Sequence, residues 1–137
     1  MVGLLIMGCG SKLPVATLDV AGHSVKAEIA ATDDSRQRGL MFRDSMGTDD
    51  GMLFVYEDQQ VRHFWMKDTR IPLSIAFANR EGVIVRIEDM KPFDTETRTS
   101  SLVPATYALE MNQGWFAKNG VEKGAVITGI PEGLTVE

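Results

Sequence analysis

The greatest density of chemically distinct side chains lies in residues 64–75, where an indole, a lysine, an acid and hydroxyls follow one another closely. Lys67 is the central candidate, because a lysine held away from water can have a lowered pKa and act as a base or nucleophile. Glu110 lies within the apolar run of residues 105–111, and a buried carboxylate needs a partner. We therefore predict an ion pair between Lys67 and Glu110, whose carboxylate would relay a proton.

The same pair has a purely structural interpretation. A buried ion pair can fix the register of neighbouring strands without taking part in any reaction. Arg36, Arg43 and Asp68 would support the pair in either role. A catalytic pair would make the protein an enzyme, a hydrolase or lyase acting on an envelope saccharide. A structural pair would leave a binding domain or a structural interaction module, and the residues alone are compatible with each of these classes.

Aromatic residues predict a ligand cleft with Lys67 and Arg43 at its polar end. Its walls would be Trp65, Phe54, Tyr107, Trp115 and Phe116. Aromatic walls with a few convergent polar groups are typical of small-molecule sites, and tryptophan beside arginine or lysine suits a carbohydrate or carboxylate ligand. The competing interpretation is a plain aromatic core, which is the stronger one for Phe54 and Phe116. The residues that we predict to bind a small anionic or sugar-like ligand, or a partner protein, are Trp65, Met66, Lys67, Glu110, Arg43 and Tyr107.

Metal and cofactor signatures are weak. Thioethers and imidazole bind Cu(I), and methionines recur near His63, but no Met-x-Met repeat occurs. Methionine more often fills irregular gaps in a core. With two histidines a triad of histidine ligands cannot be built. The sequence also lacks a phosphate loop, Cys-x-x-Cys and His-Glu-x-x-His, so we expect neither a metal nor a cofactor.

Alternating apolar and polar residues predict about eight short strands. Turn residues 21–24 and 79–82 predict two hairpins, and Thr32 is a good N-cap for a short helix that stops at Gly39. We expect a mainly β, single-domain antiparallel sandwich or jelly-roll-like barrel with one or two short helices. The predicted strands are 15–20, 25–29, 52–56, 61–67, 71–78, 83–90, 105–111 and 125–130, with a helical turn at 114–119.

Strand periodicity also predicts which side chains share a face. In 61–67, Trp65 and Lys67 share one face and neither face is cleanly apolar, so one face should line a cleft. In 105–112, Glu110 faces the opposite way from Tyr107. On this strand one face should carry Tyr107, Leu109 and Met111, and the opposite face Thr106, Ala108, Glu110 and Asn112.

Six collinear blocks of the sequence are distinctive: residues 36–43, 51–56, 64–67, 72–73, 107–110 and 114–116. Together they resemble the DUF192 family of bacterial and archaeal proteins. The resemblance covers about residues 20–130 and implies a jelly-roll-like β domain, often secreted or lipid-anchored, with no established activity. This chain has Asp68 where asparagine commonly follows the lysine, Ser74 where an aspartate often follows Pro-Leu, and Ala125 instead of an acid. If an aspartate at position 74 were catalytic in relatives, this chain would lack it.

Composition limits the partners. The 137 residues fit one domain, and the net charge of −5 argues against nucleic acid, whose affinity depends on clustered basic residues. The same charge disfavours unaided docking on an anionic membrane. No stretch approaches the ~20 apolar residues of a membrane-spanning helix. We expect a monomer that binds a small molecule or a protein, and that meets the membrane only through a lipid anchor.

That anchor would be Cys9, the only cysteine. Residues 6–9, Ile-Met-Gly-Cys, resemble the bacterial lipoprotein cleavage signal, although no basic segment precedes the short apolar run. We therefore interpret residues 1–16 as a truncated signal with lipidation site and tether, and residues 17–137 as the β domain. This interpretation predicts an exported protein of the cell envelope, lipid-anchored or periplasmic. A frayed apolar tail with an incidental cysteine is the alternative.

Overall fold

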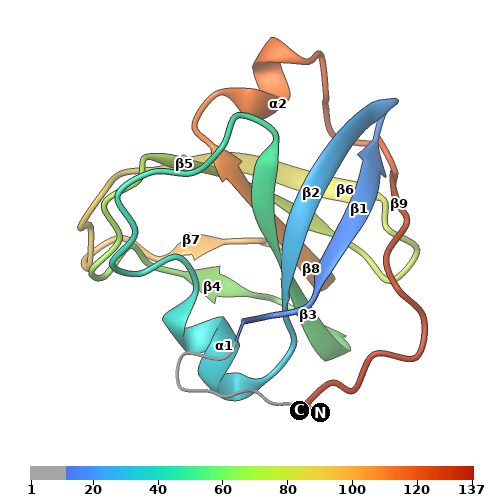
Figure 1. Cartoon of the computed structure of the whole chain (residues 1–137), viewed down its shortest axis with the longest axis horizontal. Coiled ribbons are helices and arrows are strands. Elements are labelled where there is room, and N and C mark those ends of the chain that lie inside the picture. Colours follow the sequence, from blue (N-terminus) through green and yellow to red (C-terminus); the bar gives the residue numbers. More distant parts are fainter. Residues whose placement is uncertain (1–11) are drawn as a thin grey trace, which may run out of the picture.

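The computed structural model describes residues 12–137, in which β-strands predominate over two short helices (Figure 1). The predicted lipidation site at Cys9 lies outside the described residues. In chain order the elements are β1 (Val15–Val20), β2 (His23–Ala30), α1 (Asp33–Arg38), β3 (Asp50–Gln60), β4 (His63–Phe64), β5 (Leu73–Ala78), β6 (Ile84–Met90), β7 (Thr99–Ser100), β8 (Ala105–Asn112), α2 (Trp115–Lys118) and β9 (Ile127–Thr128).

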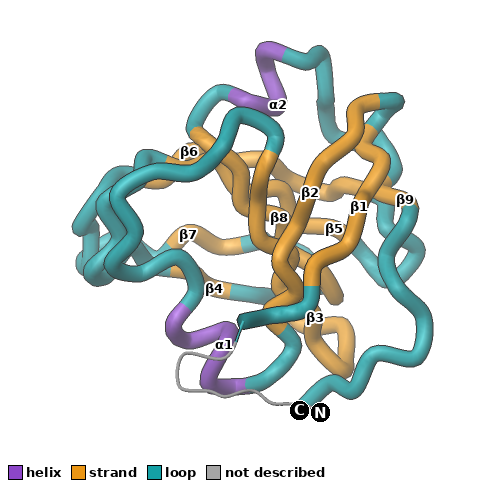
Figure 2. The backbone as a smooth tube through the Cα atoms, in the orientation of Figure 1, coloured by secondary structure: helices purple, strands orange, loops and turns teal. Residues whose placement is uncertain are grey.

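Seven strands form one curled sheet in the order β6-β5-β8-β3-β2-β1-β9, and β4 pairs separately with β7. The curl makes a half-barrel, visible in the tube trace of Figure 2, and a bridge between Val83 and Val126 joins its two ends. The predicted single-domain, mainly β architecture is confirmed. The strand pairs in the described chain are antiparallel except β2 with β3, which run parallel.

Local sequence signals set the turns as expected. Ala21 and Gly22 have φ of +51° and +88°, as a two-residue hairpin turn that follows the twist of its strands requires, and β1 pairs with β2 around them. Thr32 caps α1, because its hydroxyl accepts a hydrogen bond from the Ser35 N–H at 3.1 Å. The helix ends at Gly39, where φ is +48°.

The large sheet buries side chains on both faces. One face packs against α2 and the C-terminal segment, and its core includes Leu18, Leu109 and Phe116. The other face carries Phe54, Ile75 and Phe77, among others, and is covered by Leu40 after α1 and by Phe64 and Met66 around β4. The predicted alternation is confirmed from Tyr107 onward, since Tyr107, Leu109 and Met111 pack in the first core and Ala108 in the second. Glu110 therefore faces the second core. Ala105 also lies in the second core, because the pairing of β8 with β3 is irregular between Val55 and Gln60.

The predicted strand 61–67 is wrong beyond two residues. Only His63 and Phe64 are extended and paired, and they pair with β7 rather than with β8. The chain turns at Lys67 and Asp68, where the Thr69 N–H donates to the Met66 carbonyl at 3.2 Å and the Thr69 hydroxyl donates to the Lys67 carbonyl at 2.9 Å. The apolar-polar alternation of the sequence did not predict this turn. Residues 67 and 68 are neither glycine nor proline, the strongest sequence signals for a turn.

Asp68 holds that turn in the left-handed region, with φ of +52°. Its carbonyl accepts the Phe42 N–H at 2.9 Å, so the strained position ties two loops together. Asparagine tolerates this region at least as well as aspartate. We predict that Asp68→Asn changes the unfolding free energy by less than about 0.5 kcal/mol, whereas Asp68→Val lowers it by about 1–2 kcal/mol. Urea denaturation measures both, and equal effects would contradict the backbone explanation.

Candidate functional site

A cavity of about 350 Å³ opens on the second face of the sheet, between α1 and the segment around β4. We call it the Glu110 pocket. Its floor is formed by sheet residues Phe54, Leu73 and Glu110. Trp65 and Met66 form part of the wall, so three of the predicted ligand-binding residues share this pocket. It has the dimensions and aromatic lining of a small-molecule site.

Glu110 is the chemically distinctive residue of the pocket. It lies in the middle of β8, opposite Met52 on β3 and Ile75 on β5, and is only 4% exposed. Arg86 Nε is the one fully buried side-chain polar atom without a partner in the described chain, so the carboxyl oxygens of Glu110 must reach the open space of the pocket. Burial raises the pKa of Glu110 from 4.5 to about 8, so this carboxyl is protonated at neutral pH.

The predicted ion pair between Lys67 and Glu110 is wrong. Lys67 is exposed in the turn after β4, and within residues 12–137 neither residue forms an ion pair. Its Nζ lies 5.7 Å from the centre of the Trp65 ring, at the outer side of the pocket wall. The prediction failed because β8 is flanked by β3 and β5, which leaves no neighbouring position for the segment that contains Lys67. The acid–base pair of the enzyme alternative is therefore not assembled.

Arg43 and Tyr107 lie away from the Glu110 pocket. Arg43 donates to both carboxylate oxygens of Glu28, at 2.5 and 2.9 Å, beside a separate open groove. Tyr107 is on the opposite face of β8 and borders the C-terminal segment. The wider cleft that was to unite Trp65 with Tyr107, Trp115 and Phe116 is likewise not formed, because Trp115 and Phe116 belong to the first core.

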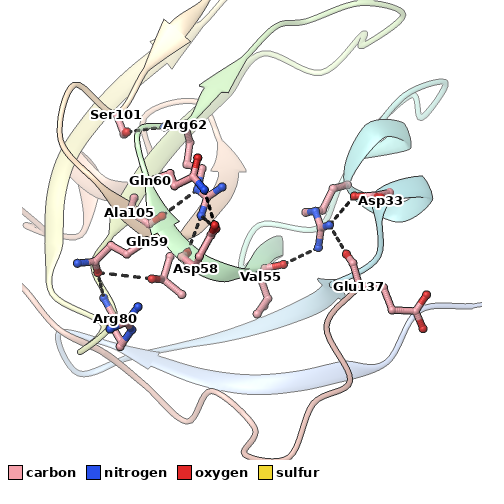
Figure 3. Close-up of polar contacts among 12 residues, drawn as sticks. Asp33, Val55, Asp58, Gln59, Gln60, Arg62, Arg80, Ser101, Ala105 and Glu137 are labelled. Atoms are coloured by element: carbon pink, nitrogen blue, oxygen red, sulfur yellow. Dashed lines mark hydrogen bonds and ion pairs between the residues drawn. The ribbon is translucent and has the colours of Figure 1, made fainter.

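Arg36 and Tyr56 line the Glu110 pocket, but neither was predicted from the sequence as a ligand-binding residue. Arg36 was only a supporting candidate and Tyr56 was not a candidate. Arg36 donates to the Val55 carbonyl and to Asp33, both at 2.8 Å, and to the Glu137 carbonyl (Figure 3). Tyr56 carries Arg36 at 4.9 Å from its ring centre and Arg62 at 3.8 Å. Alternation along β3 could have found Tyr56, since it follows Met52 and Phe54 at every second position.

Burial raises the pKa of Tyr56, and Glu110 raises it further, while the charges of Arg62 and Arg36 act in the opposite direction. Arg62 is itself held by Asp58 at 2.7 Å and by the Ala105 carbonyl at 2.9 Å (Figure 3). The Tyr56 ring is therefore held beside the pocket by Arg36 and Arg62, and its hydroxyl stays neutral and does not act as a base.

Position 74 does not belong to this pocket. Ser74 points to the other face of β5 from Leu73 and Ile75, and its hydroxyl bridges Asp89 at 2.6 Å and the Gly114 N–H at 2.9 Å. An aspartate at this position would lie on the wrong face of the sheet to act with Glu110. Within residues 12–137 no three His, Cys, Asp or Glu side chains are grouped as metal ligands.

These features define a class of protein: a single-domain β half-barrel with a small pocket built around a buried carboxyl. The sequence profile of the DUF192 family, described as "Uncharacterized ACR", matches residues 16–129. The chain therefore belongs to the DUF192 family.

Solved structures agree with this assignment. A Sinorhizobium meliloti 1021 protein described as a "putative transcription regulator" is 31% identical with a TM-score of 0.84, covering 88% of this chain and 98% of that one. A protein of unknown function from Novosphingobium aromaticivorans DSM 12444 is also 31% identical, with a TM-score of 0.81 and coverage of 85% and 86%. No curated protein matches this chain. In the described chain no helix has the length and apolar character to span a membrane.

Proposed function

We propose that this domain binds a small, hydroxylated, neutral or anionic ring compound in the Glu110 pocket. The observation that carries the proposal is the buried carboxyl of Glu110, which faces the pocket without a partner from residues 12–137. Buried polar groups are nearly always hydrogen-bonded, so one left open toward a cavity calls for an occupant. A protonated carboxyl offers one donor and one acceptor, and a ligand hydroxyl complements both.

The charges around the pocket favour a neutral or anionic ligand. With Glu110 protonated, the Asp and Arg side chains on the lining are Asp33, Arg36 and Arg38, and the imidazole of His63 also lines the pocket. Asp33 is neutralised by its 2.8 Å ion pair with Arg36. Arg38 is exposed and has no ion-pair partner in the described chain, which leaves one positive charge at the pocket mouth. A ligand carboxylate would complement it.

The walls favour a ring. Phe54, Phe64 and Trp65 border the pocket, and Phe54 meets Phe64 edge to face with ring centres 5.0 Å apart. Such rings offer flat apolar surfaces to the C–H face of a sugar or to a planar compound. Trp65 is 39% exposed, so part of the indole remains open to a ligand.

Three probes with one ring shape and different charges test this function: glucuronate, glucose and glucosamine. We expect NMR shifts of pocket residues with glucuronate and glucose at pH 6, and weaker binding of glucosamine. Raising the pH to 9 ionises Glu110, so glucuronate binding should weaken at least tenfold, because two like charges would then share the pocket. Isothermal titration gives the affinities.

Two variants sharpen the test. Glu110→Gln should keep glucuronate binding at pH 6 and lose its weakening at pH 9, since glutamine stays neutral. Arg38→Gln should weaken glucuronate but leave glucose unchanged. No shift with any of the probes at millimolar concentration would overturn the proposal, as would tighter binding of glucosamine than of glucuronate at pH 6.

We also propose that the domain acts in the cell envelope, anchored by a lipid on Cys9. The Ile6–Cys9 segment supports this. The mass of the protein extracted from membranes tests it: a chain beginning at a lipidated Cys9 is expected, and an unmodified chain beginning at Met1 would contradict it. In 0.5 M salt, which screens any electrostatic attraction to the bilayer, Cys9→Ser should release the protein into the soluble fraction.

A further inference from the structure

Three loops that are distant in sequence lie side by side at one end of the half-barrel (Figure 1). Residues 38–46, 65–70 and 91–98 make up this surface, which we call the loop face. Backbone hydrogen bonds join them: Phe42 N–H to the Asp68 carbonyl at 2.9 Å, Phe93 N–H to the Thr69 carbonyl at 3.1 Å, and Met66 N–H to the Asp94 carbonyl at 2.9 Å. The loops therefore form one connected surface.

Each loop exposes one aromatic side chain. Phe42 is 52% exposed, Trp65 39% and Phe93 61%, and no other aromatic residue in the described chain is among its exposed large apolar residues. Phe42 and Phe93 also have φ of +67° and +64°. A bulky residue at positive φ is strained, and such strain persists where the surroundings enforce it, often at functional positions. Leu102, outside the loop face, is also exposed at a φ of +61°, so strain with exposure does not by itself distinguish the loop face. What points to an interaction outside the domain is the grouping of three exposed aromatic side chains on loops that hydrogen bonds join.

The charge of the protein is unevenly distributed. The loop face carries six basic and four acidic residues, which leaves eight of the 14 basic and 15 of the 19 acidic residues for the rest of the chain. Arg43 is paired with Glu28 of β2, so the loop face has a small excess of positive charge and the remainder of the chain is strongly negative. Two of the cations lie on the tryptophan, with the Arg98 guanidinium 4.1 Å and Lys67 Nζ 5.7 Å from its ring centre.

We propose that the loop face docks on an anionic lipid bilayer, with Phe42, Trp65 and Phe93 entering the headgroup region. Tryptophan flanked by cations is typical of membrane–water interfaces, and each basic residue near an anionic surface contributes about 1 kcal/mol. The negative remainder of the molecule would be repelled, which orients the loop face toward the membrane.

A lipid surface fits these residues better than a peptide does. A peptide in a groove needs a continuous hollow, but Phe93 borders none of the described cavities, and Phe42 and Trp65 border different ones. A deformable bilayer can accept aromatic side chains presented by separate loops.

The chain also enters the domain at this end. Lys12, the first described residue, borders the same groove as Phe42 and Arg43. An anchor at Cys9 would lie within about 11 Å of Lys12 along an extended chain, which would hold the loop face near the bilayer. The docking itself does not depend on that anchor.

Vesicle binding of the full chain carrying Cys9→Ser, which cannot be lipidated, tests the proposal. Vesicles of phosphatidylcholine with one quarter phosphatidylglycerol should sediment at least tenfold more protein than phosphatidylcholine alone, and 0.5 M salt should abolish the difference. Tryptophan emission should shift to the blue on binding. Trp65→Phe should remove this shift, since Trp115 is already buried.

The decisive variant is Phe42→Asn/Phe93→Asn. Asparagine tolerates positive φ, so the variant removes the aromatic rings without adding strain and should fold. It should lower vesicle binding at least tenfold. The matched control is Leu102→Asn/Val103→Asn, two residues that are 63% and 43% exposed outside the loop face, and it should bind as before. Leu102 has a φ of +61°, so asparagine is again the residue that adds no backbone strain. Equal losses in the two variants, no loss in the Phe42→Asn/Phe93→Asn variant, or a preference for duplex DNA over the anionic vesicles would overturn the proposal.

Discussion

Glu110→Gln is expected to stabilise the protein by about 4 kcal/mol at pH 8 and to remove most of the pH dependence of its stability between pH 4.5 and 9. Burial raises the pKa of Glu110 to about 8, whereas the unfolded chain titrates near 4.5. Folding at pH 8 therefore forces an otherwise ionised carboxyl to take up a proton or to remain charged in an apolar pocket. Glutamine has nearly the same shape and carries no charge, so it avoids this free-energy cost.

The sign of the effect follows from proton linkage. The folded state binds its proton on Glu110 up to about pH 8, and the unfolded state releases it above about pH 4.5. Stability from this group is therefore fully present below pH 4.5 and falls by ~1.4 kcal/mol per pH unit up to about pH 8, where it levels off. A ligand that donates to the ionised carboxyl would offset the loss.

Urea denaturation at several pH values between 4.5 and 9 measures this. The wild type should lose stability relative to Glu110→Gln as the pH rises, and the two curves should converge near pH 4.5. Glu122→Gln changes an exposed acid in the same way and serves as the control, with an expected effect below about 0.5 kcal/mol. Parallel curves for wild type and Glu110→Gln would mean that water or a counter-charge keeps the carboxyl ionised.

The strand order explains which parts of the site could be predicted from the sequence. Hairpin turns and alternation are local signals, so the placement of Glu110 on the opposite face from Tyr107 followed from periodicity alone. Contact between Glu110 and Lys67 required knowing that β8 lies between β3 and β5, which is a non-local fact. The ion pair between Lys67 and Glu110 was predicted because their charges are complementary and both residues are unusual in apolar segments. Without the strand order, charge complementarity alone gave the wrong contact.

The turn at Asp68 could not be predicted from local sequence either. Positive φ at a non-glycine residue is sparsely populated, so no propensity argument favours a turn at Lys67 and Asp68. Hydrogen bonds from Phe42 and Phe93 to this turn impose it from other loops. The strand prediction failed there because tertiary contacts overrode the local pattern. The same contacts created the loop face, whose exposed aromatic residues no periodicity could place together.

Gly82→Ala is expected to destabilise the protein at least twice as much as Gly22→Ala. The two glycines have nearly equal φ, +83° and +88°. Both substitutions therefore carry a similar backbone penalty of about 1 kcal/mol. A Cβ at Gly22 meets nothing within 4 Å, but a Cβ at Gly82 would lie 2.5 Å from the Ile127 carbonyl oxygen. The larger loss of stability in Gly82→Ala therefore measures how closely the backbone at Gly82 approaches the backbone at Ile127.

That approach is where the half-barrel closes. The Ile127 N–H donates to the Gly82 carbonyl at 2.8 Å, and the Ile84 N–H donates to the Ala125 carbonyl at 2.8 Å, so an alanine must push β9 away from the start of β6. We predict a loss of about 2–4 kcal/mol for Gly82→Ala, the range for a core clash or strained backbone position. Urea denaturation gives the magnitudes, and hydrogen exchange should show faster exchange at Ile84 and Ile127 in this variant alone. Equal destabilisation by the two alanines would mean that closure contributes little to stability, and the half-barrel would then be held mainly by the pairing of its central strands.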